Sequence, residues 1–124
     1  MIDTDILINL IKSGQLIVIL DKYDLYISII TLYEYLRGLK ILDRNIIEAK
    51  GLLEKSFSII LLDNKVINCA CNLYKALRSD GLLIDDRDLL IAASAIAFEL
   101  PLWTGNVKHF SRLEKYGLRI WKEN

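Results

Sequence analysis

Hydrophobic positions along the chain follow two patterns that alternate. Short continuous apolar runs, rich in β-branched and aromatic residues, are each followed by stretches in which apolar residues recur every three or four positions. The runs predict strands at 1–2, 25–30, 58–62, 101–104 and 118–121. The helical repeats predict helices at 6–11, 16–20, 31–39, 46–53, 66–77, 89–98 and 106–113. Buried strands separated by helices indicate a parallel sheet with right-handed crossovers. The predicted fold class is therefore α/β, a three-layer α/β/α sandwich with a mainly parallel four- to five-stranded sheet.

Polar residues mark the expected starts of these helices. Thr31 to Glu34 has the sequence of a capping box, so a helix is predicted to open at Thr31. Asp63 is predicted to cap the helix that begins at Asn64, and Asp85 and Asp86 suit the cap of the next one. Asp3 and Asn106 also suit cap positions, so a structural role must be weighed for each of these residues.

Composition limits the class of protein. The chain has 124 residues, 53% hydrophobic and 26% charged, which predicts a single globular domain over 1–124. Its net charge is zero, so any acidic substrate must be met by a local patch. Cys69 and Cys71 point to nearly opposite sides of a predicted helix and are expected to be free thiols in a reducing compartment. The longest uncharged apolar run, Leu89 to Phe98, is about half the roughly 20 residues that span a bilayer, so we expect a cytoplasmic protein with no membrane segment.

Acidic and amide side chains follow several predicted strands. They are Asp3 and Asp5 after the first strand, Glu34 one turn into the helix after the second, Asp88 at the start of an apolar helix, and Asn106 after the fourth. The carboxyl ends of parallel strands share one sheet edge, so these groups are expected to converge. Converging carboxylates repel one another, and a bound divalent cation would remove that cost.

The ligand types select the metal and the chemistry. With oxygen donors only, the site suits Mg²⁺ or Mn²⁺. Such ions lower the pKa of a bound water and neutralise charge on a phosphodiester, so metal-dependent hydrolysis of a phosphodiester is the predicted reaction.

Four stretches of the sequence resemble the four motifs of PIN domains, in the order and spacing of VapC-type toxins. They are Asp3 to Leu7, Thr31 to Gly38, Asp86 to Ala95 and Pro101 to Phe110. The resemblance implies a PIN-like domain that acts as an endoribonuclease on RNA, with Asp3, Glu34 and Asp88 binding Mg²⁺ or Mn²⁺. Asn106 falls on the family's fourth polar position and joins the predicted catalytic set. The resemblance further implies a homodimer that a cognate VapB-type antitoxin neutralises.

Accessory roles are predicted around these ligands. Thr4 and Thr104 are expected to hydrogen-bond the acids, and Asp5 stands where the family usually has asparagine, which adds negative charge. Asp86 is a further accessory candidate, and Arg37 either orients Glu34, contacts phosphate or forms a helical ion pair. His109 is the only histidine, which excludes catalysis by paired histidines; a place near the RNA and a surface or capping role both fit it.

Two other functions compete with the ribonuclease. Asp3 and Asp5 resemble the paired aspartates of haloacid-dehalogenase-type phosphatases, a nucleophile followed by a general acid, although Leu7 stands where threonine is expected. Alternatively, Asp63 would accept a phosphoryl group in a non-catalytic signalling module in which Asp3 and Asp5 hold Mg²⁺. The ribonuclease hypothesis treats Asp63 as a helix cap.

Overall fold

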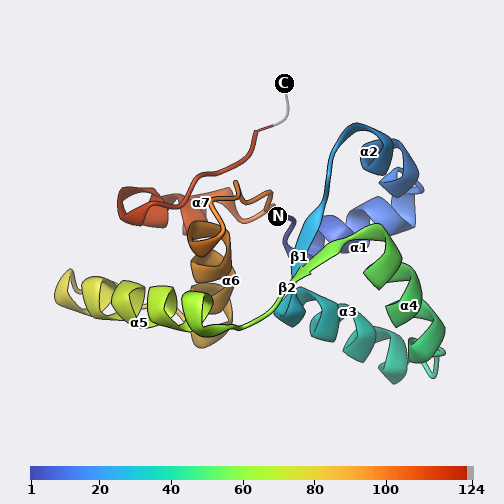
Figure 1. The fold of residues 1–124 in the computed structure, drawn as a ribbon, viewed down its shortest axis with the longest axis horizontal. Helices are drawn as coiled ribbons and strands as arrows, with labels where there is room; N and C mark the ends of the chain where they lie inside the picture. The colour runs from blue at the N-terminus through green and yellow to red at the C-terminus, as the bar shows by residue number, and fades with distance from the viewer. Residues whose placement is uncertain (123–124) are drawn as a thin grey trace. The chain divides into compact units, whose positions relative to one another are not determined.

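The computed structural model describes residues 1–122 and divides the chain into two compact units, Met1–Ile60 and the part from Leu61 onward. Each unit is described by itself below, and Figure 1 shows the course of the chain through both. None of the helices within residues 1–122 is both long enough and apolar enough to cross a membrane, as the sequence predicts. The expectation of a single domain over 1–124 stays a prediction.

The first unit is built on two short parallel strands. Strand β1 (Tyr26–Ser28) pairs with β2 (Ser58–Ile60) in parallel register. The backbone N–H of Ile2 donates to the carbonyl of Tyr26 at 2.9 Å, so the start of the chain lies beside β1. Around the strands lie the helices α1 (Thr4–Ser13), α2 (Leu16–Lys22), α3 (Ile29–Ile41) and α4 (Ile46–Ser56). The parallel pairing was predicted, but both strands are shorter than expected.

Helix α1 shows how local sequence sets the geometry of this unit. Leu7 and Leu10 lie on its buried face at the predicted helical spacing. The helix ends at Gly14, whose φ of 72° is a left-handed conformation that glycine adopts without steric cost. Helix α1 is therefore held between Asp3 at its first end and Gly14 at its second.

The second unit is mainly helical. Helix α5 (Asn64–Ser79) packs on α6 (Asp86–Ala97), and a short helix α7 (Val107–Phe110) leads into a 3₁₀ helix, η1 (Ser111–Tyr116). The predicted apolar stripe of α5 is buried and consists of Val66, Ala70, Leu73 and Leu77. Helix α6 buries small residues that let helices approach closely, namely Ala92, Ala93 and Ala95. Leu102 and Ile120 form a parallel bridge.

Several predicted element boundaries were wrong. The strand expected over 25–30 ends at Ser28, and α3 begins at Ile29, not at Thr31. The hydroxyl of Ser28 caps the helix by accepting a hydrogen bond from the backbone N–H of Ile30 at 3.1 Å. Ile29 and Ile30 look like strand residues because β-branched side chains favour strands, but the serine cap ends the strand before them. Thr31 is fully buried as the third residue of the helix, inside its first turn, so it does not form the capping box.

Of the remaining predicted elements, some differ from the structure and others are confirmed. The helix expected at 106–113 is divided between α7 and η1, and the strands expected at 101–104 and 118–121 meet in the single bridge of Leu102 and Ile120. Within residues 1–122, the named strands form one two-stranded sheet. Two of the predicted caps are confirmed: Asp63 accepts from the N–H of Val66 at 3.0 Å, and Asp85 from that of Asp88 at 2.8 Å. Cys69 and Cys71 are free thiols, as expected.

The cap of α5 yields a test of local stability. Asp63→Ala removes the side chain that holds the N–H of Val66, so it should lower the free energy of unfolding by about 0.5–2 kcal/mol. Asp63→Asn is the matched control, since an asparagine side chain still caps and should retain most of that stability. Urea unfolding followed by circular dichroism measures both variants. Equal stability of all three proteins would show that the cap is dispensable.

Candidate metal centre

Asp3 lies between Ile2, whose backbone pairs with Tyr26 of β1, and the start of α1. Its backbone is extended, it stands at the N-cap of α1, and its Oδ1 accepts a hydrogen bond from the N–H of Thr4 at 2.8 Å. Only 4% of the residue is exposed, so the carboxylate sits in a confined position. A buried carboxylate is stabilised by such donors and by the positive end of a helix. Capping therefore holds the Asp3 carboxylate in place at the start of α1.

Thr4 connects the start of α1 to α3. Its hydroxyl donates to Oε1 of Glu34 at 2.6 Å, and it lies 3.2 Å from the hydroxyl of Thr31. A hydroxyl has one proton to donate, and Thr4 gives it to the carboxylate, so the hydroxyl of Thr31 is the donor in the second contact. The chain Thr31, Thr4, Glu34 orients the Glu34 carboxylate. The first unit thus gathers Asp3, Thr4 and Glu34, as predicted, and adds Thr31.

In the second unit, both carboxylate oxygens of Asp88 have a nitrogen neighbour. Nη1 of Arg87 lies 2.6 Å from Oδ1, and Nε2 of His109 lies 3.0 Å from Oδ2. The side chain of Asp88 is 14% exposed, in the first turn of α6. Arg87 and His109 are the partners that the sequence analysis did not assign to this acid. Their only signal was position: Arg87 precedes Asp88, and His109 lies in the motif that contains Asn106.

Asn106 and the accessory candidates Asp5, Asp86 and Arg37 are exposed. The N–H of Asn106 donates to the hydroxyl of Thr104, a buried residue, at 3.0 Å, and the asparagine stands at the N-cap of α7 without a side-chain capping bond. Asp5 and Asp86 lie exposed in the first turns of α1 and α6. The guanidinium of Arg37 lies 5.1 Å from the ring centroid of Tyr33, a cation–π contact at an exposed site.

The predicted ligands have the chemistry that divalent cations prefer. They offer carboxylate oxygens, and the guanidinium on Asp88 shows that this carboxylate takes a cationic partner. Among residues 1–122, no group of three or more His, Cys, Asp or Glu side chains is placed so that it could hold one ion. That Asp3, Glu34 and Asp88 bind one ion stays a prediction.

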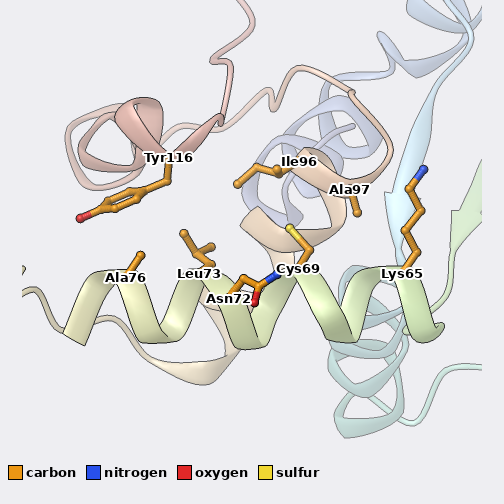
Figure 2. A pocket seen from close by; sticks show the side chains of 8 residues that line it. All are labelled: Lys65, Cys69, Asn72, Leu73, Ala76, Ile96, Ala97 and Tyr116. Atoms are coloured by element: carbon orange, nitrogen blue, oxygen red, sulfur yellow. The ribbon is translucent and has the colours of Figure 1, made fainter. Parts of the chain in front are cut away.

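A separate pocket lies in the second unit, between α5, the end of α6 and η1. Figure 2 shows the side chains that line its volume of about 420 Å³: Lys65, Cys69, Asn72, Leu73, Ala76, Ile96, Ala97 and Tyr116. Its lining contains no carboxylate, so it does not suit a divalent cation. The ammonium of Lys65 lies 4.9 Å from the ring centroid of Phe98, and partial burial raises the pKa of the Cys69 thiol, which makes it a poorer nucleophile.

Comparison with known proteins identifies a family for nearly the whole chain. Residues 1–116 match the family described as PIN domain, so the match runs through both units. The chain is 36% identical over 121 residues to Ribonuclease VapC1 of Methanocaldococcus jannaschii, which covers 98% of this chain and 85% of that protein. This match favours the ribonuclease hypothesis over the phosphatase and signalling hypotheses.

Solved structures give the same fold. A chain of VapBC2 from Rickettsia felis, bound to a DNA fragment from its promoter, has a TM-score of 0.74 and 27% identity, covering 98% of this chain and 97% of that one. A chain of VapBC-1 from nontypeable Haemophilus influenzae has a TM-score of 0.77 and 24% identity, covering 98% and 95%. The predicted fold class, α/β with a parallel sheet, is that of these neighbours.

Proposed function

The chain belongs to the PIN-domain family, and from this membership we propose that it is a metal-dependent endoribonuclease, the toxin of a toxin-antitoxin pair. The observation that carries the proposal is the 36% identity to Ribonuclease VapC1 over nearly the whole chain. The local geometry supports it, because the acids of the PIN motifs are the acids that hydrogen-bonding partners hold in place. RNA is the proposed substrate.

The proposed ligands are Asp3, Glu34 and Asp88, with Asn106 as a fourth polar group, and the proposed ion is Mg²⁺ or Mn²⁺. Both ions prefer oxygen ligands, and the donor set of these residues has no sulfur. When bound, such an ion supplies an activated water and offsets negative charge at the phosphorus. The protein's part is to fix the orientation of the acids before the substrate arrives.

That orientation comes from residues outside the ligand set. Thr4 donates to Glu34 and thereby holds one carboxylate oxygen, while its own N–H holds Asp3. Arg87 offsets the charge of Asp88 in the chain without metal. Outer hydrogen bonds of this kind set the direction and basicity of ligating carboxylates. The buried Thr31 in turn fixes Thr4, so a rigid helix pair, α1 and α3, carries the first part of the site.

The partner proposed for this chain is a VapB-type antitoxin, with a homodimer as the assembly and the cytoplasm as its place. The structural neighbours are VapBC proteins, and the first unit exposes many large apolar side chains on its helices. The most exposed of them are Ile17 on α2, Ile41 on α3 and Ile47 on α4. Apolar side chains that gather into one exposed patch mark a protein-binding surface, and α3 and α4, which carry Ile41 and Ile47, pack against each other.

Metal removal tests the proposed reaction. EDTA should abolish cleavage of RNA by the pure protein, and Mg²⁺ or Mn²⁺ should restore it. The reason is that the proposed reaction needs a divalent ion and all proposed ligands are oxygen atoms, which these two ions prefer. The products should carry 5′-phosphate and 3′-hydroxyl ends, since water and not the ribose 2′-hydroxyl attacks. Sequencing of RNA ends with and without phosphatase treatment measures this. Cleavage that persists in EDTA, or cyclic 2′,3′-phosphate ends, would contradict the proposal.

Alanine substitution separates metal ligands from structural acids. Asp3→Ala, Glu34→Ala and Asp88→Ala should each reduce cleavage by orders of magnitude, because each removes a proposed ligand. Each also removes an observed hydrogen-bond or ion-pair partner, so cleavage is compared per amount of folded protein. Asp3→Ala removes a helix cap and should lower stability by about 0.5–2 kcal/mol. Asp63→Ala is the matched control: it loses a cap and keeps cleavage. If instead all four variants cleave RNA when folded, the acids are structural.

Charge substitution tests the partner surface. Ile47→Lys should weaken binding of the proposed cognate antitoxin, because it places a desolvated charge in an apolar contact. Leu83→Lys, at an equally exposed apolar residue of the second unit, is the control and should bind normally. Calorimetric titration of the purified pair, with light scattering to establish the dimer, measures both. Equal weakening by the two variants would place the contact elsewhere.

A further inference from the structure

His109 is held in one orientation by a neighbour on its own segment. It lies on α7, and Arg112, three residues on, contacts it twice. Nε of Arg112 donates to the carbonyl of His109 at 3.0 Å, and Nη2 of Arg112 lies 3.0 Å from Nδ1 of the ring. Two contacts from one guanidinium fix both the backbone and the ring edge.

This arrangement assigns the proton on the ring. A guanidinium only donates hydrogen bonds, so Nδ1 must be the acceptor, and Nε2 then carries the N–H. Nε2 is shielded from solvent and lies 3.0 Å from Oδ2 of Asp88, although the angle between them is outside that of a hydrogen bond. The buried Nε2–H of this ring therefore faces the Asp88 carboxylate, and a small rotation would let Oδ2 accept a hydrogen bond from it.

The two oxygens of Asp88 have different neighbours. His109 stands at Oδ2, and the guanidinium of Arg87 stands 2.6 Å from Oδ1. Oδ1 is thus the oxygen that a cation already approaches, whereas Oδ2 faces a neutral donor. Ligating carboxylates in metal centres commonly have one oxygen on the ion and the other on a hydrogen-bond donor.

We propose that His109 is a positioning residue for Asp88: its Nε2–H holds Oδ2, Arg112 keeps that proton on Nε2, and Oδ1 is thereby presented to the metal ion. This inference rests on the proposed function for the identity of the ion, but its geometry lies wholly within the second unit. It gives the sole histidine a task that is neither acid-base catalysis nor RNA contact.

Three substitutions isolate the proposed hydrogen bond. His109→Leu removes the donor and keeps a similar volume, His109→Gln keeps an N–H at a similar reach, and Arg112→Ala removes the group that fixes the ring. Lys108→Ala, at an exposed neighbour on α7, is the control. Mn²⁺ affinity of each full-length protein is measured by electron paramagnetic resonance titration, and metal-free stability by thermal unfolding.

The expected order of affinity decides the question. His109→Leu should weaken Mn²⁺ binding by about 10–100-fold, the usual effect of losing an outer partner of a ligand, while His109→Gln should restore most of it. Lys108→Ala should bind Mn²⁺ as the unsubstituted chain does. If His109→Leu binds Mn²⁺ normally, or if Gln is as weak as Leu, the proposal is wrong. A structural role alone would lower the unfolding temperature without this dependence on the donor.

A spectroscopic measurement tests the inference independently of nuclease activity. With one histidine in the chain, ¹⁵N labelling of histidine yields one ring in the spectrum of the metal-free protein. Nδ1 should be unprotonated and Nε2 protonated, and both signals should move in Asp88→Asn and in Arg112→Ala. A ring protonated at Nδ1, or one that does not respond to Asp88→Asn, would overturn the inference even if RNA is cleaved. Failure of RNA cleavage with these signals intact would overturn the proposed function alone.

Discussion

Carboxylates can be buried only where donors or cations replace the water they lose, and this constraint organises both halves of the candidate site. Asp3 has the N–H of Thr4, Glu34 has the hydroxyl of Thr4, and Asp88 lies between Arg87 and His109. Each partner comes from the same unit as its acid. The acids are therefore oriented locally, within each unit.

Capping and function are not alternatives at these positions. Asp3 caps α1 with one oxygen, and Asp85 caps α6 so that Asp88 falls in its first turn. A helix start offers free N–H groups and a positive dipole, which position an acid and stabilise its charge. The same local structure that explains these acids as caps also suits them as ligands, so only the contacts of the remaining oxygens distinguish the two roles.

The helices of the first unit carry a second constraint. Thr31 and Leu32 bury one side of α3, which fixes the face from which Glu34 meets Thr4. Residues such as Ile41 and Ile47 stay exposed although they are large and apolar. A toxin needs both a rigid site and a surface that a neutralising partner covers. The same short helices supply residues for both.

The sequence by itself determined the order of elements, the parallel pairing and several helix caps, because periodicity and caps are local signals. It misplaced the start of α3, since Ile29 and Ile30 have strand propensity and only the Ser28 cap overrides it. Tertiary structure alone decided that Thr31 hydrogen-bonds Thr4 instead of capping, and that His109 faces Asp88 across 21 residues of sequence. Such contacts depend on how segments far apart in the sequence pack, and no pattern along the chain shows which of their side chains will meet.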